Sequence, residues 1–231
     1  NDGFRGFDIG VEESTGHFVA VYEKDTTADR TLYYRVWNGT ADLDGNQWGA
    51  EGTITLGSGV AAEAQLYVAL ERRPNSSSEE MMLASAGTSD DISVARWNGS
   101  DWVNVTFVTT GGAALDEERF SIAWESGSGD AMIVWGEGTT NANYSIWSGT
   151  NLNWTNGGLV RNRGAVVEQV KICSDPTSDY IGAIFGPDSL ADVLAVMWNG
   201  THWLSGEPTE YTSGEATAEK NAYCAWTKNT S

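Results

Sequence analysis

The chain has 231 residues, of which 40% are hydrophobic, and a formal net charge of −19 at pH 7. This hydrophobic content is sufficient for a packed core, and the acidic balance argues against nucleic acid or an anionic membrane as a partner, because both would repel the protein. No apolar run reaches 18 residues, so the sequence predicts no transmembrane span.

Three short apolar runs precede each of four Trp-rich turns, and none of them shows a helical period. Their length, alternation and polar boundaries are typical of β-strands, and a fourth strand opens on a second Trp in every group. In chain order the expected strands are Phe7–Val11, His17–Tyr22 and Leu32–Trp37 before Trp48; Ala64–Leu70, Met81–Ala86 and Ile92–Trp97 before Trp102; Phe120–Trp124, Ala131–Trp135 and Tyr144–Trp147 before Trp154; and Val166–Cys173, Tyr180–Phe185 and Val193–Trp198 before Trp203.

The Trp at the end of each third strand begins a repeated motif. Asn-Gly follows Trp37, Trp97 and Trp198, and Ser-Gly follows Trp147, so the Trp residues are 60, 50 and 51 positions apart. Asn and Gly both tolerate positive φ, which predicts a tight hairpin of type I′. A period near 50 residues indicates one supersecondary unit used several times. We expect a single repeat domain over 1–231, with repeats at about 1–58, 59–112, 113–164 and 165–214 and an extra strand within 215–231.

Four antiparallel strands in about 50 residues are typical of a β-propeller blade. In this pattern the chain resembles the bladed repeats of secreted, sialidase-like and other surface-protein propellers. The Asp-box of sialidases and the WD and kelch signatures are absent from the sequence. The resemblance implies an all-β, propeller-like fold of four four-stranded antiparallel repeats. A β-sandwich or an open stack of sheets is the alternative, since both also use short alternating strands.

The C-terminal segment predicts one strand beyond the four repeats. A lone strand has unpaired backbone groups on an exposed edge, and three explanations remain open. The chain is cut from a longer propeller, the strand closes its own sheet, or the strand is donated to a neighbouring subunit in head-to-tail assembly. The start at Asn1 rather than Met predicts a processed or excised product. The candidate assembly strand consists of Asn221, Ala222, Tyr223, Cys224, Ala225 and Trp226.

Eight Asn-x-Ser/Thr sequons predict a secreted, N-glycosylated protein at the cell surface or outside the cell. In such a setting a disulfide between the only two cysteines, Cys173 and Cys224, is expected, with two buried free thiols as the alternative. Their separation of 51 residues equals the repeat period, so the bond would join the C-terminal segment to the preceding repeat. The sequons begin at Asn38, Asn75, Asn98, Asn104, Asn143, Asn153, Asn199 and Asn229.

Two further features bear on ligands. Trp37, Trp97, Trp147 and Trp198 either form platforms on which sugar rings stack or pack as the core of the repeat, and regular recurrence favours the core. Asp42, Asp44 and Asn46 resemble a fragment of a calcium loop but lack the EF-hand spacing, so they are a weak calcium candidate. No other metal or cofactor is expected.

Catalytic residues are not indicated. His17 and His202 lie at different places in their repeats, and no triad, Cys-His pair or zinc site is recognisable. We therefore predict a non-enzymatic, glycosylated structural protein, the subunit of a surface filament, sheath or layer that self-assembles into a homopolymer by strand addition. The alternatives are a carbohydrate-binding, lectin-like propeller and a fragment of a larger secreted propeller such as a sialidase-like protein.

Overall fold

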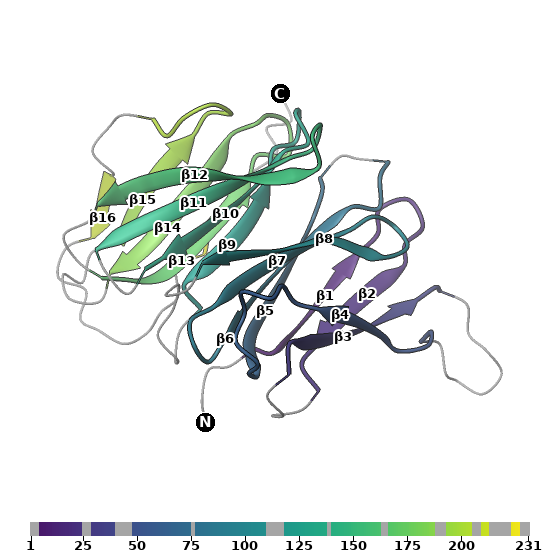
Figure 1. Ribbon diagram of the computed structural model, residues 1–231. Coiled ribbons are helices and arrows are strands. Elements are labelled where there is room, and N and C mark those ends of the chain that lie inside the picture. The colour runs from purple at the N-terminus through teal and green to yellow at the C-terminus, as the bar shows by residue number, and fades with distance from the viewer. Residues whose placement is uncertain are drawn as a thin grey trace. The chain divides into compact units, whose positions relative to one another are not determined.

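The computed structural model of the chain divides into two compact units, residues 1–110 and 111–231 (Figure 1). Its described part contains strands and turns but no helix, and therefore no helix that could span a membrane. Each unit holds two four-stranded antiparallel sheets in which strands consecutive in sequence are neighbours. The described residues are 5–24, 29–39, 48–74, 77–109, 118–137, 140–162, 166–187, 193–204, 209–212 and 223–226.

The first unit contains the first and second sheets. Strict alternation places Val19 and Val21 on one side of their strand and half-buried residues on the other, as expected for a strand with one covered face. The first sheet consists of β1 (Phe7–Val11), β2 (Phe18–Tyr22), β3 (Thr31–Trp37) and β4 (Gly52–Thr55), and the second of β5 (Gln65–Arg72), β6 (Met81–Gly87), β7 (Ile92–Trp97) and β8 (Trp102–Thr109).

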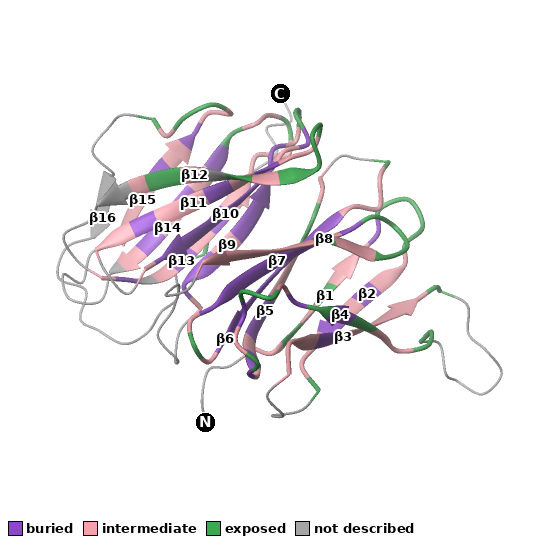
Figure 2. Ribbon diagram, viewed as in Figure 1, coloured by how far each residue is buried: buried purple, intermediate pink, exposed green. Residues whose placement is uncertain are grey.

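The second unit repeats this plan with the third and fourth sheets. Every residue of β10, like every residue of β6 in the first unit, is buried, because these second strands lie inside their sheets and are covered on both faces (Figure 2). The third sheet consists of β9 (Phe120–Trp124), β10 (Ala131–Gly136), β11 (Asn141–Ser148) and β12 (Asn153–Asn162), and the fourth of β13 (Val167–Ser174), β14 (Ile181–Pro187), β15 (Val193–Trp198) and β16 (Thr209–Thr212).

Each unit has its own core between its two sheets. In the first unit Val19, Val21 and Leu32 pack with Leu83 and Trp97 of the second sheet. Burial of each such aliphatic side chain contributes about 1.5–3 kcal/mol. The second unit has the same arrangement, in which Met132, Val134 and Ala142 pack with Ile181, Ala183 and Trp198 of the fourth sheet.

In each unit a tyrosine on the third strand of one sheet packs against two Trp residues of the other sheet. Tyr34 on β3 packs edge-on against Trp97 and Trp102, with ring centroids 5.7 and 6.5 Å away. Tyr144 on β11 contacts Trp198 with tilted rings at 5.6 Å and Trp203 edge-on at 5.8 Å. Such aromatic pairs contribute about 0.5–1.5 kcal/mol beyond their area burial. The two units therefore use one design for the contact between their sheets.

The all-β fold with four antiparallel, four-stranded repeats is confirmed, and each sheet lies within one of the four expected repeat ranges. The turn after the Trp differs from the expected type I′ hairpin, which needs positive φ at both central residues. Gly39, Gly99 and Gly200 have φ of 77°, 95° and 91°, respectively, whereas the Asn before each of them does not have positive φ. Asn98 instead uses its side-chain Oδ1 to accept hydrogen bonds from the backbone N–H groups of Ser100 and Asp101, which is an Asx turn.

Candidate functional site

The two Trp residues of each repeat lie opposite each other. Trp102 and Trp154 belong to β8 and β12, whereas Trp48 and Trp203 pair through isolated bridges ahead of β4 and β16, so the expectation that a Trp opens every fourth strand is wrong for these two. Trp97, Trp147 and Trp198 are at most 2% exposed, so these three residues are core residues, which is the role that the regular recurrence favours. In their pairs the ring centroids are 5.5 to 5.9 Å apart. The opposed pairs are Trp37 with Trp48, Trp97 with Trp102, Trp147 with Trp154, and Trp198 with Trp203.

The Trp pair of the first sheet is the open one among these four. Trp48 is 36% exposed and Trp37 is half-buried, with Phe18 packed edge-on against Trp37 at a centroid distance of 5.2 Å. Part of the Trp48 indole ring is therefore exposed at the surface, next to the half-buried ring of Trp37. Of the third-strand Trp residues proposed from the sequence as stacking platforms, Trp37 is the one that the structure leaves accessible.

This pair belongs to a larger apolar surface, which we call the outer face. It is the side of the first sheet opposite to the buried Val19, Val21 and Leu32. Phe7 and Ile9 on β1 are 67% and 51% exposed. Exposed aromatic and aliphatic side chains grouped on one sheet mark a contact surface. The register of the strands places on this face Phe7, Ile9, Phe18, Tyr22, Tyr33, Arg35, Trp37 and Trp48.

Polar groups adjoin the aromatic rings on the outer face. Arg35 donates from Nε to Tyr22 Oη at 3.3 Å and from Nη1 to the carbonyl of Gly49 at 3.2 Å. The Tyr22 hydroxyl donates to Glu51 Oε2 at 2.8 Å, and Lys24 Nζ donates to Glu51 Oε1 at 2.5 Å. The Arg35 guanidinium is also 3.9 Å from the Glu51 carboxylate. Arg35 and Glu51 are 38% and 23% exposed, so both can still bind an external group.

The charges of this cluster follow from its hydrogen bonds. The hydrogen bond from Lys24 lowers the pKa of Glu51 below its ordinary value, and the bond from Tyr22 adds to that effect. Burial raises the pKa of Tyr22, and the neighbouring Glu51 carboxylate raises it further. At neutral pH the cluster therefore presents an ionised carboxylate, a guanidinium, an ammonium and a neutral phenol.

This arrangement is suited to a ligand with one apolar side and several hydroxyl groups. The Trp rings offer flat apolar surface, the carboxylate accepts hydrogen bonds, and the guanidinium donates them. The repeated motif in the sequence indicated Trp37 but gave no indication of Arg35 or Glu51. One signal for Arg35 is present in the sequence, because Tyr33, Arg35 and Trp37 alternate along one strand and must share a face.

The sequons predicted for glycosylation are distributed over both units. Asn98 and Asn199 accept hydrogen bonds with Oδ1 within their turns, and Nδ2 of Asn199, the atom that would carry a glycan, lies 3.4 Å from His202 Nε2. Glycosylation itself stays a prediction. Asn38, Asn98, Asn104 and Asn153 are exposed, Asn143 and Asn199 are half-buried, and Asn75 and Asn229 lie outside the described residues.

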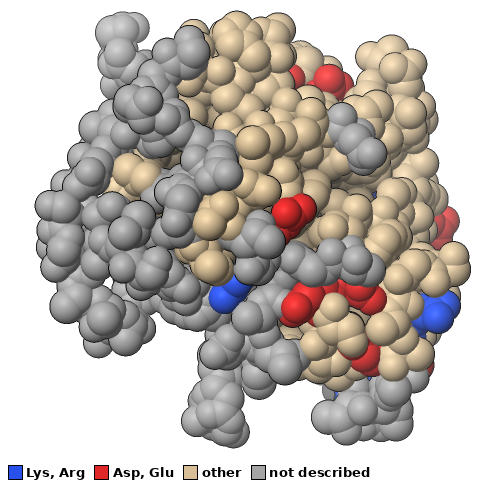
Figure 3. Space-filling model, turned by 60° about the vertical axis from the view of Figure 1, so that its left-hand side comes forward, with Lys and Arg blue, Asp and Glu red and all other residues tan. Residues whose placement is uncertain are grey.

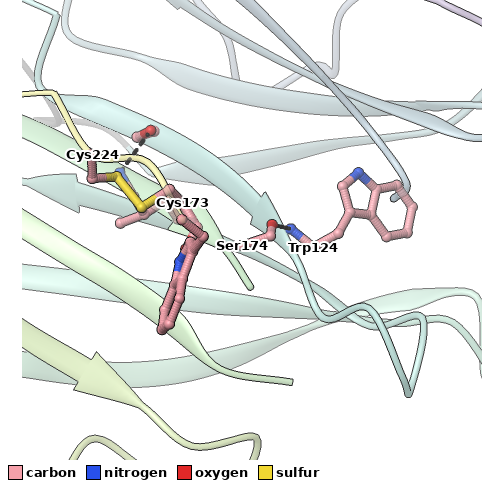
Figure 4. Close-up of a disulfide and its surroundings, with 7 residues drawn as sticks. Trp124, Cys173, Ser174 and Cys224 are labelled. Atoms are coloured by element: carbon pink, nitrogen blue, oxygen red, sulfur yellow. Dashed lines mark hydrogen bonds between the residues drawn. A yellow bond between two sulfur atoms is a disulfide. The ribbon is translucent and has the colours of Figure 1, made fainter. Parts of the chain in front are cut away.

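Cys173 and Cys224 form a disulfide with their Cα atoms 5.9 Å apart (Figure 4). The Trp226 indole N–H donates to the Cys173 carbonyl at 2.9 Å, so two contacts fasten the C-terminal segment to β13. Nearby, Ser174 Oγ accepts a hydrogen bond from the backbone N–H of Trp124 at 2.9 Å. The strand expected at the C-terminus is irregular backbone over its four described residues, 223–226, while Asn221 and Ala222 lie outside the described part.

The remaining expectations concern charge and metals. Figure 3 shows acidic side chains spread over the drawn face with basic ones scattered among them, in keeping with a solvated surface. The calcium candidates Asp42, Asp44 and Asn46 lie outside the described residues. Within the described ranges, no group of three or more His, Cys, Asp or Glu residues is placed to hold a metal ion.

The fold is similar to that of solved β-propeller lectins. The BP39L lectin from Burkholderia pseudomallei matches with a TM-score of 0.63 at 10% identity, over 90% of this chain and 56% of that chain. The Aleuria aurantia lectin, a six-bladed β-propeller with a described mode of fucose recognition, matches with a TM-score of 0.55 at 11% identity, over 88% and 59%. A Hadza microbial sialidase, Hz136, matches with a TM-score of 0.51 at 9% identity, over 87% and 46%.

These similarities support the propeller-type fold and the expected resemblance to propellers of this kind. The chain spans somewhat more than half the length of the lectins it matches. No family model and no curated protein matches the sequence.

Proposed function

We propose that this protein is a carbohydrate-binding, lectin-like β-propeller protein and that the outer face of the first sheet contacts the sugar. The observation that carries the proposal is the open pair of Trp37 and Trp48 beside the ionised Arg35 and Glu51. An apolar sugar face stacks on the indole rings, while the charged groups exchange hydrogen bonds with its hydroxyls. No covalent chemistry is required of the chain.

The fold comparisons support this choice among the alternatives that the sequence left open. Several structures of similar fold are named lectins, and two of them were solved with α-methyl fucosides bound. A self-assembling filament, sheath or layer subunit receives no such support. The disulfide and the sequons favour an extracellular location, since oxidised cysteines persist there.

The first ligand to test is α-methyl-L-fucoside, followed by a panel of neutral monosaccharides. Binding is measured by titration calorimetry and by quenching of Trp fluorescence. We expect saturable binding that Trp48→Ala and Arg35→Ala each weaken by roughly tenfold or more, because truncation of an aromatic or Arg anchor typically costs about 2 kcal/mol.

The matched control is Leu152→Ala, which removes an exposed apolar side chain of the second unit, 44% exposed, and leaves the outer face intact. Binding by this variant should equal that of the wild type. The proposal fails if no sugar of the panel binds, or if Trp48→Ala and Arg35→Ala bind as tightly as the wild type. Circular dichroism of each variant establishes that the loss is not a loss of folding.

A further inference from the structure

Three fully buried polar side chains of the second sheet have no hydrogen-bond partner among the described residues. Gln65 is 2% exposed and both atoms of its amide are unpartnered; Ser85 and Ser93 are 0% and 1% exposed with unpartnered hydroxyls. Ser85 lies opposite Ser93, and Gln65 lies opposite Gly87, two residues along the same strand from Ser85. All three therefore share the face that packs toward the first sheet. A buried polar group without a partner costs about 1–3 kcal/mol.

The repeat does not require polar residues at these positions. Val167 in the fourth sheet corresponds to Gln65 in the second sheet. Each is the first paired residue of its sheet, and a register shift follows each of them. Phe185 in the fourth sheet corresponds to Ser85 in the second sheet. Phe185 lies four residues after Ile181, the strand partner of Trp198, and Ser85 lies four residues after Met81, the strand partner of Trp97. Val167 and Phe185 are 1% and 2% exposed and belong to the core of their unit. An apolar core fits this position, so the polar set is a specific feature of the second sheet.

Two buried carboxylates lie close to members of this polar set in the chain, Glu63 two residues before Gln65 and Asp91 two residues before Ser93. Glu63, 7% exposed, accepts hydrogen bonds from Thr88 Oγ1 at 2.7 Å and from the backbone N–H of Ser89 at 2.8 Å. Asp91, 3% exposed, accepts one from the backbone N–H of Ala61 at 2.5 Å. Neither carboxylate has an ion-pair partner in the described ranges. Both still have lone pairs available, since an ionised carboxylate has about four acceptor sites.

Gly87 marks the place where the amide and a carboxylate approach each other. A Cβ at this position would lie 2.9 Å from Gln65 Nε2 and still closer to the carboxylate of Glu63. The absence of a Cβ at Gly87 therefore lets the Glu63 carboxylate and the Gln65 amide pack against this backbone, close to each other. A half-turn of the Gln65 amide exchanges its nitrogen and oxygen and places a carbonyl oxygen beside the Glu63 carboxylate.

We propose that Glu63, Asp91, Gln65, Ser85 and Ser93 border a binding site for a hard cation of the Ca²⁺ class, separate from the carbohydrate surface. Ca²⁺ takes about six to eight oxygen ligands in flexible geometry, including carboxylates, amide carbonyls and water. Two carboxylates balance its charge, and the amide and hydroxyls gain the partner that they lack. With only two charged ligands, the affinity falls in the range of about 10⁻⁴ to 10⁻³ M that is typical of extracellular modules.

The test uses protein freed of divalent ions by a chelator and then titrated with Ca²⁺ in a KCl buffer. Calorimetry and thermal unfolding should give one bound ion and a rise in Tm, because a ligand that binds the folded state alone stabilises it. Mg²⁺ should produce a smaller rise, since it requires near-ideal octahedral geometry. Glu63→Gln and Gln65→Val, which copies the fourth sheet, should each weaken Ca²⁺ binding by roughly tenfold or more.

Asp101→Asn is the matched control, because it removes one exposed negative charge of the same unit. It should bind Ca²⁺ like the wild type. The absence of heat and of a Tm shift at millimolar Ca²⁺ would mean that ordered water satisfies these polar groups, which overturns the proposal. Unchanged binding by Glu63→Gln would place the ion elsewhere and overturn it as well. Anomalous diffraction from a Ca²⁺-soaked crystal locates the ion directly even if Gln65→Val does not fold.

Discussion

The indole N–H of Trp97 donates a hydrogen bond to Glu12 Oε1 at 2.7 Å, although the two residues are 85 positions apart in the chain. The second unit contains the same bond, from Trp198 to Glu125 Oε1 at 2.6 Å. In both units the acid follows the first strand of one sheet, and the Trp ends the third strand of the next sheet. The repeated Trp is therefore fixed by a polar contact as well as by packing.

The carboxylate of this contact is itself held in place. Thr15 Oγ1 donates to Glu12 and Ser128 Oγ donates to Glu125, each at 2.6 Å. Each acid thus satisfies a Trp of the neighbouring sheet and a hydroxyl of its own turn. The pattern Glu-x-x-Thr/Ser-Gly after a first strand is the sequence signal of this contact.

Removal of the carboxyl group should destabilise the second unit. Glu125→Ala leaves the buried indole N–H of Trp198 without its acceptor, and an unsatisfied buried donor costs about 1–3 kcal/mol of the free energy of unfolding. Glu125→Gln keeps an acceptor oxygen at this position and should retain most of the stability. Urea unfolding of the three proteins measures the difference. Equal midpoints for Glu125→Ala and the wild type would contradict this role.

The stability should also depend on the ionisation of Glu125. Burial raises the pKa of Glu125 above 4.5, and the charges of Asp179 and Asp130 raise it further, against the opposing hydrogen bonds from Ser128 and Trp198. The folded state therefore binds this proton more tightly than the unfolded state does, and ionisation costs stability at neutral pH. As the pH falls from neutral through the folded pKa toward 4.5, the wild type should gain stability relative to Glu125→Gln.

Unfolding of both proteins in urea at neutral pH and near pH 5 measures that change. Comparison with Glu125→Gln cancels the titration of the other carboxyl groups, which the two proteins share. A difference in unfolding free energy that stays constant across this range would show that Glu125 titrates at its ordinary value.

Carbohydrate binding should depend on the charge of Glu51. Because the hydrogen bond from Lys24 lowers its pKa, Glu51 stays ionised below the pH at which an ordinary glutamate takes a proton. Binding should therefore be constant from neutral pH to about pH 5 and decline only as the pH falls through the lowered pKa. Glu51→Gln should bind more weakly at every pH and lack this decline. Calorimetric titration of both proteins over the range tests the prediction, and a decline already near pH 6 would contradict it.

Much of the fold was predictable from the sequence because its signals are local. Alternation along strands such as Phe18–Tyr22 and the Trp that ends each third strand define four-stranded repeats without reference to distant residues. The turn after Trp97 was placed correctly, but its type was wrong, since the Asn98 side chain caps the turn and so removes the need for positive φ at Asn98.

The candidate site could not be predicted to the same extent. The pairing of Arg35 with Glu51 depends on how the chain between β3 and β4 returns, and nothing local in the sequence sets that register. The accessibility of Trp37, in contrast with the burial of Trp97, depends on which sheet covers which face. Nearly identical tetrapeptides, which differ only in Thr40 against Ser100, therefore have different roles, and the difference arises from tertiary context.

The last prediction concerns the link between the C-terminal segment and β13. Cys173 and Cys224 are separated by 51 residues, and a cross-link over a loop of that length typically stabilises a protein by about 2–4 kcal/mol through the unfolded state. Cys224→Ser should therefore lower the free energy of unfolding of the second unit by that amount and leave the first unit unchanged. Trp226→Phe removes the hydrogen bond to the Cys173 carbonyl together with part of the aromatic ring and should cost about 1 kcal/mol or more. Hydrogen exchange read separately for residues 1–110 and 111–231 distinguishes the two units, and equal protection of the second unit in Cys224→Ser and the wild type would refute the stabilising role of the disulfide.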